Sequence, residues 1–137
     1  MTPGTWGVFH DGTIERIEGA VPGSVLLSLE IPYLRAMFPG EGTSFHIRLD
    51  ACTKLTYNEY DAPSTSDLNR VKQREPEILY VKSEQPLVLD CVMGTLELAY
   101  ATMSVALENG TRVSEQALVE ACESYWKRWQ ESAAREA

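Results

Sequence analysis

The sequence has few of the residues that build metal sites, disulfide frameworks or membrane-spanning segments. Only two histidines and three cysteines occur among its 137 residues, and the cysteines are odd in number and widely spaced. Because this spacing matches neither a disulfide framework nor a zinc-ligand pattern, we predict reduced thiols, no metal and no cofactor. The longest stretch without a charge or a turn residue, 98–107, is far shorter than the roughly 20 apolar residues of a membrane helix.

Basic side chains are also scarce. The chain has 12 Lys and Arg against 20 Asp and Glu, a formal charge of −8. Residues 1–70 hold 5 basic and 9 acidic side chains and residues 71–137 hold 7 and 11, so each half carries −4. Nucleic acids and anionic membranes bind cationic surfaces. We therefore predict no nucleic-acid partner and no membrane partner, and we expect an electrostatic partner to be basic.

Motifs of the common enzyme classes are missing as well. The chain has no phosphate-binding glycine loop, nucleophile elbow, zinc-protease helix or calcium loop. This weakens the case for an enzyme without excluding one, because carboxylates can still converge from separate strands. Residues 1–7 lack the cationic start and apolar run of a secretory signal, which favours a cytoplasmic location.

The residues that are present suit one soluble domain. Apolar residues make up 44% of the chain and charged residues 23%. A chain of this length can bury roughly two-thirds of its unfolded surface, so it needs no disulfide or metal to hold a core. We predict a single domain over 1–131 and a frayed tail over 132–137.

Alternation of apolar and polar residues predicts strands over most of the chain. In the clearest case, every second residue from Phe45 to Tyr57 falls on one face, which predicts one long strand. Asp11-Gly12 is typical of a hairpin turn. The segment 33–38 is either one helical turn or an irregular plug. Shorter strands are predicted over 6–9, 13–18, 25–31, 77–82 and 87–93.

Two further segments leave alternatives open. Over 95–108 the apolar spacing fits a helix, but a phase slip of one residue favours a strand with a bulge or bend near Ala101 and Thr102. Over 59–76 the alternation of apolar and polar residues stops. Ser66 is the predicted amino-terminal cap of a short helix in this segment. A connection this long is either functional or locally disordered.

The most regular helical pattern runs from about Glu115 to Glu131, after Ser114 as amino-terminal cap. Its apolar stripe is expected to pack on a sheet. The predicted fold class is α+β, a twisted antiparallel sheet of about seven strands, open or closing toward a barrel, with the C-terminal helix packed on it. The stripe consists of Leu118, Ala121, Cys122, Tyr125 and Trp129.

A row of polar residues on the outer face of the predicted long strand is the candidate ligand groove. The row either lines a groove or simply faces water. Its members are His46, Arg48, Asp50 and Lys54.

Two other sets are candidates for an interface. Arg70, Lys72 and Arg74 make the only locally basic segment, which is either functional or a solvated face. Val119 and Trp126 widen the apolar arc of the last helix to about 160°. That edge belongs either to the core or to an interface with a second copy or a foreign partner.

These features together favour a small acidic cytoplasmic protein that acts by protein–protein interaction. In size, acidity and strand-then-helix build, the chain resembles the small immunity proteins that neutralise bacterial toxins by covering a basic active-site cleft. That resemblance implies a basic protein partner, and a homodimer is the other association we expect. The alternative is a small-molecule binder or small enzyme that uses the concave face of the curled sheet.

Overall fold

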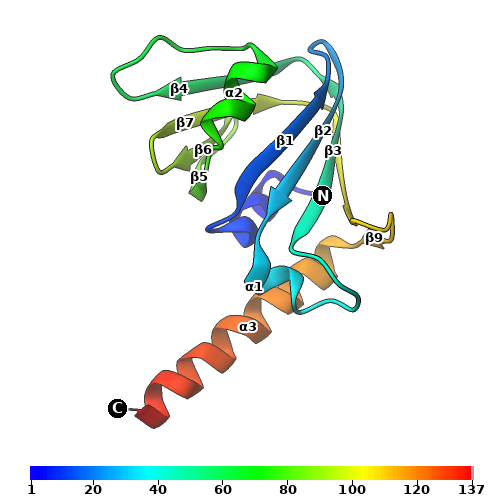
Figure 1. The fold of residues 1–137 in the computed structure, drawn as a ribbon, viewed down its shortest axis with the longest axis vertical. Coiled ribbons are helices and arrows are strands. Elements are labelled where there is room, and N and C mark those ends of the chain that lie inside the picture. The colour runs from blue at the N-terminus through cyan, green and yellow to red at the C-terminus, as the bar shows by residue number, and fades with distance from the viewer. Residues whose placement is uncertain (137) are drawn as a thin grey trace.

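The computed structural model describes residues 1–136 and contains two antiparallel sheets and a long C-terminal helix, α3 (Figure 1). Sheet A has the order β1-β2-β3-β8-β9 and sheet B the order β4-β7-β6-β5. The predicted α+β class is confirmed, with nine strands in two sheets that do not close into a barrel within residues 1–136. Sheet A comprises β1 (Thr13–Gly19), β2 (Gly23–Glu30), β3 (Ser44–Cys52), β8 (Thr102–Leu107) and β9 (Arg112–Val113). Sheet B comprises β4 (Lys54–Glu59), β5 (Ile78–Glu84), β6 (Leu87–Cys91) and β7 (Gly94–Ala99).

The chain begins with a 3₁₀ helix, η1 (Pro3–Phe9), where the sequence predicts a strand over 6–9. That prediction is wrong because Trp6 and Phe9, three residues apart, lie on one side of a 3₁₀ helix and both point into the core. Both side chains are fully buried, and their rings meet edge to face at 5.8 Å. The Trp6 indole N–H also donates to the Tyr100 hydroxyl at 2.8 Å.

The predicted long strand over 45–57 is divided into two strands that belong to different sheets. Ala51 adopts a φ of 49°, in the left-handed region, and the chain there turns from β3 in sheet A into β4 in sheet B. Ala51 and Thr53, expected on the inner face, are exposed, whereas Cys52 is fully buried. The prediction of one continuous strand is therefore wrong.

The neighbouring segment bends at the same level. β7 in sheet B passes into β8 in sheet A, which confirms the predicted strand with a bend near Ala101. Hydrogen bonds continue through the bend, because Thr53 N–H donates to the Ala99 carbonyl at 2.8 Å and Ala101 N–H to the Asp50 carbonyl at 2.9 Å. The two sheets thus share one bent ribbon along one side.

On the other side the sheets meet more briefly. Thr13 forms an antiparallel bridge with Glu77, next to the start of β5. The helix α2 (Leu68–Arg74) contacts β1 and β4, and its Val71 is fully buried. Asp67, rather than the predicted Ser66, caps α2 by accepting from two backbone N–H groups. The connection over 59–76 is thus ordered, and its helix α2 contacts a strand of each sheet.

The last helix, α3 (Glu115–Glu136), starts directly after β9. Ser114 caps it as predicted, since its hydroxyl accepts from Ala117 N–H at 3.1 Å. The first turns bury Leu118 and contact η1 and α1 (Pro32–Arg35), the helical turn left open by the sequence. The rest of α3 extends away from both sheets (Figure 1).

The helix is also longer than predicted. Residues 132–136, expected to fray, continue α3, and residue 137 lies outside the described residues. A helix that leaves the body needs no tertiary contact to complete its own backbone hydrogen bonds. Despite its length, none of the helices within residues 1–136 is apolar enough to cross a membrane.

A buried arginine fixes α1 and the loop that follows it. Arg35 is only 2% exposed, and its Nε donates to Glu108 Oε1 at 2.7 Å. Its other nitrogens donate to the carbonyls of Pro39 at 3.2 Å and Glu41 at 2.9 Å. Burial opposes ionisation of Glu108, but the hydrogen bond and charge of Arg35 outweigh it and lower the pKa of that carboxyl.

We expect Arg35→Met to lower the free energy of unfolding by about 3 kcal/mol, because it leaves a carboxylate and several carbonyls without a donor. Urea denaturation measures the loss. The matched control is Arg16→Met, because the Arg16–Glu18 pair is more than half exposed on both sides. The control should cost less than about 1 kcal/mol. Equal losses in the two variants would contradict an anchoring role for Arg35.

Candidate functional site

An open groove lies between α1 and the exposed half of α3. Tyr33 is held in place because its hydroxyl donates to the His10 carbonyl at 2.7 Å. Its ring packs on Tyr125 of α3, with centroids 4.5 Å apart. The groove has a volume of about 450 Å³ and is mainly apolar. It is lined by Tyr33, Ala36, Met37, Tyr125, Arg128, Trp129 and Ser132.

Aromatic rings continue from the groove along one side of α3. Trp126 meets Tyr125 at 5.1 Å, Tyr33 at 5.8 Å and Trp129 at 5.9 Å between centroids. It also lies 6.5 Å from the ring of His10. Trp126 is half-buried, while Trp129 is 55% exposed. We take this contiguous aromatic surface as the candidate binding site.

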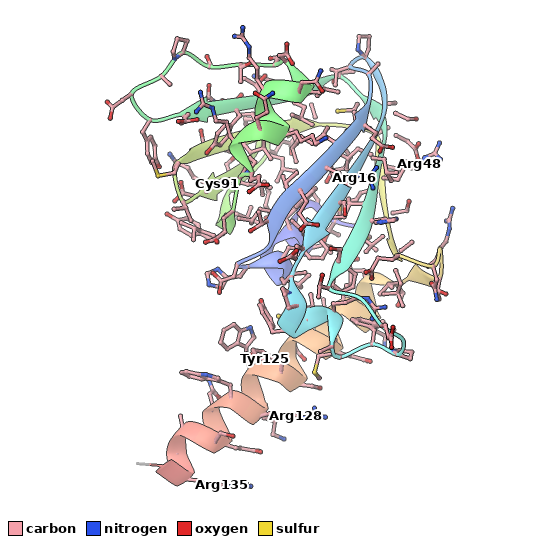
Figure 2. The ribbon with its side chains drawn as sticks, in the orientation of Figure 1. Arg16, Arg48, Cys91, Tyr125, Arg128 and Arg135 are labelled. Atoms are coloured by element: carbon pink, nitrogen blue, oxygen red, sulfur yellow. The ribbon has the colours of Figure 1, made fainter. Side chains whose placement is uncertain are left out.

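The apolar stripe of α3, expected to pack on a sheet, contacts mainly η1 and α1, and its last residue is exposed. Tyr125 lies beside α1, whereas Arg135 marks the part of α3 that has left the body (Figure 2). Trp129 belongs to that part, which explains its exposure. The stripe therefore extends about one turn past the last element that could cover it.

A carboxylate at the start of α3 holds the helix against η1. Glu115 Oε1 accepts from the backbone N–H of Thr2 at 3.1 Å and from its hydroxyl at 2.7 Å. The Thr5 hydroxyl donates to the same oxygen. These hydrogen bonds, that of Thr5 foremost, lower the pKa of Glu115 to about 2. An ionised side chain therefore ties the start of α3 to the amino-terminal segment.

The predicted polar row is not a closed ligand groove. His46, Arg48 and Asp50 do share the outer face of β3, and Arg48 points away from sheet B (Figure 2). Arg48 Nε donates to Asp50 Oδ1 at 2.8 Å, and this hydrogen bond is the main cause of the lowered pKa of Asp50. Two open hollows touch the row, one of about 150 Å³ beside His46 and one of about 230 Å³ beside Arg48.

Lys54, the fourth member of the row, lies on sheet B. The bend at Ala51 separates it from the other three, and its Nζ pairs with Glu97 of β7 at 2.5 Å. The prediction that one strand face carries all four residues is therefore wrong. The other three residues lie on the solvent-facing side of β3, where Arg48 and Asp50 form an ion pair.

The basic residues of α2 lie at the opposite end of the molecule from α3 (Figure 1). All three are exposed, and Arg74 Nε pairs with Glu59 at 3.2 Å. Arg70 and Arg74 line a hollow of about 130 Å³ next to Thr65. Lys72 does not line it, so the three cations do not form one site.

The interface predicted on α3 stays a prediction, and the structure shows where its two residues lie. Val119 is 36% exposed and Trp126 lies within the aromatic surface. The groove itself, however, is built with Tyr33 and Met37, which the sequence did not single out. Their segment is too short for periodicity to show that it faces α3.

Chemistry based on thiols or metals has little support. All three cysteines are free, and burial raises the pKa of Cys91 to about 12 and also raises those of Cys52 and Cys122. Such thiols are poor nucleophiles at neutral pH. Within residues 1–136 no three His, Cys, Asp or Glu side chains gather as metal ligands.

We expect the docking of α3 to depend on acid pH. The stabilisation from Glu115 is fully present above pH 4.5, its ordinary pKa, and is lost as pH falls through about 2. Thermal unfolding should therefore show a larger destabilisation on acidification in the wild type than in Glu115→Gln. Glu131→Gln, which removes an exposed charge farther along α3, is the control. A wild-type-to-variant difference that does not change with pH would contradict this role.

No family model, no curated protein and no solved structure matches this chain. Its function must therefore be inferred from the chemistry of its own surfaces.

Proposed function

We propose that this chain is a small acidic protein of the cytoplasm that acts by binding a basic protein, which it engages through the groove between α1 and α3. The observation that carries this proposal is the aromatic surface on a helix that leaves the body, with Trp129 55% exposed. Its resemblance in build to toxin-immunity proteins points the same way. The three free cysteines suit a reducing compartment.

A protein partner fits the groove better than a small molecule does. Small-molecule sites bury most of their ligand in a concave pocket with a few converging polar groups. Here Trp129 and Arg128 stand at an open rim, and the polar row on β3 faces solvent. A groove between two helices takes the apolar face of an amphipathic helix from another protein.

Charge favours a basic partner over a second copy. Each chain carries −8, so two copies repel, while a basic protein is attracted before contact. Glu123 stands one turn before Trp126 on α3. Asp11 lies close enough to Tyr33 for its charge to contribute to the raised pKa of that phenol. Both carboxylates flank the aromatic surface on its Trp126 side.

The binding step needs no movement of the sheets. Tyr33, Tyr125 and Trp126 are already held by ring contacts and by the Tyr33 hydrogen bond, so little side-chain freedom is lost when a partner covers them. Trp129 is the residue with most surface left to bury. Exposed tryptophans that become buried at the centre of an interface dominate binding energy.

The test uses a synthetic helical peptide with leucines at positions i, i+3, i+4 and i+7 and lysines elsewhere. We expect it to bind the full chain with a salt-dependent affinity, and Trp129→Ala to weaken binding about 30-fold. A peptide with glutamates in place of the lysines should bind more weakly. Fluorescence anisotropy of the labelled peptide measures all three.

The matched control is Leu26→Ala, which removes an exposed apolar side chain from the outer face of sheet A. It should leave peptide affinity unchanged. Light scattering after gel filtration tests whether a second copy of the chain occupies the groove instead. A dimer that Trp129→Ala converts to a monomer would replace the proposed partner with a second copy, and equal effects of both variants on the peptide would contradict the groove.

A further inference from the structure

A second exposed surface lies at one end of sheet B, away from the groove. Four of the large apolar or aromatic side chains that remain exposed come together there. Tyr60 follows β4, and Val92 and Met93 form the turn between β6 and β7. The backbone brings them together, because Tyr60 N–H donates to the Met93 carbonyl at 2.9 Å. The exposed fractions are Tyr60 56%, Tyr80 56%, Val92 48% and Met93 57%.

Asp90 of β6 lies at the centre of this surface. It stands directly opposite Tyr80 of β5 in the strand register. The Tyr60 hydroxyl donates to its Oδ1 at 3.4 Å. Hydrogen bonding to Asp90 and its charge also raise the pKa of the Tyr80 phenol. One carboxylate is thus flanked by two tyrosines from separate elements.

The Asp90 carboxylate has no cationic partner of its own. No lysine, arginine or histidine within residues 1–136 forms an ion pair with it. On the same sheet face Glu97 is paired with Lys54, and on sheet A Asp50 is paired with Arg48. The charge of Asp90 is therefore available to a group from outside the chain.

We infer that Asp90, Tyr60 and Tyr80 form a binding site for an arginine side chain of the basic partner. This inference rests on the proposed function in one respect, that the partner is a basic protein. A guanidinium group pairs with a carboxylate through two parallel N–H bonds and stacks on aromatic rings. Val92 and Met93 supply an apolar rim for the aliphatic part of the side chain.

The two surfaces are connected along the edge of β5. The Leu79 carbonyl, next to Tyr80, accepts a hydrogen bond from His10 Nδ1. The same histidine ring faces Trp126 at 6.5 Å. His10 therefore contacts both β5, beside Tyr80, and the aromatic surface of α3.

The probe is acetyl-arginine-amide, titrated into the full chain and followed by two-dimensional NMR. We expect the amide signals around Tyr60, Tyr80, Asp90 and Met93 to shift. Acetyl-citrulline-amide, which keeps the shape but not the charge, should shift them far less. Asp90→Asn should weaken arginine binding at least about tenfold.

The tyrosines provide a second measurement that does not depend on the Asp90 variant. Tyr80→Leu should weaken arginine binding about threefold because it removes the ring face, whereas Tyr80→Phe should retain it. Asp61→Asn removes the same charge from a neighbouring exposed position and is the control. Equal shifts with arginine and citrulline, or equal losses in Asp61→Asn and Asp90→Asn, would overturn the inference.

The two proposals can fail separately. Trp129→Ala should leave arginine binding at Asp90 unchanged, because the probe is too small to reach the groove. Loss of the arginine site with normal binding of the helical peptide would overturn this inference alone. Binding of arginine at Asp90 together with full peptide affinity in Trp129→Ala would instead overturn the proposed groove.

Discussion

The double bend at residues 51–53 and 99–101 is the constraint on which the rest of the molecule depends. The same two segments of chain pair as β3 and β8 in sheet A and as β4 and β7 in sheet B. Because both segments turn together, hydrogen bonds continue through the bend and the apolar faces of the sheets enclose one core. The outer face of β3 stays in solvent, and the hollows beside His46 and Arg48 are open.

How far the sequence could predict this bend differs between its two strands. In the segment that forms β7 and β8, the alternation of apolar and polar residues shifts by one residue between Leu98 and Met103, so the bend was predictable. In the segment that forms β3 and β4, the buried residues are Leu49, Cys52 and Leu55. The inward-facing position shifts by one residue twice, the two shifts cancel, and the alternation in the sequence appears unbroken. Fold class and most strands thus follow from periodicity, whereas the division into two sheets does not.

The candidate site was predictable only where it lies on one element. The periodicity of α3 identified Trp126 and the stripe that ends at Trp129. It could not show that the sheets end before the stripe does, since periodicity indicates which face is apolar but not what covers it. Tyr33 and Met37 meet α3 from about ninety residues away in the chain, and Asp90 meets Tyr60 across two strands. Contacts of this kind depend on topology.

Acidic and exposed aromatic side chains stand together at both of the proposed binding surfaces. On the outer faces of the sheets, Arg16, Arg48 and Lys54 each pair with a carboxylate. Asp90 and Glu123, in contrast, have no ion pair within residues 1–136 and lie beside exposed aromatic rings. At these two places the proposed basic partner would meet a carboxylate and bury an aromatic ring in the same approach, so attraction and burial act together.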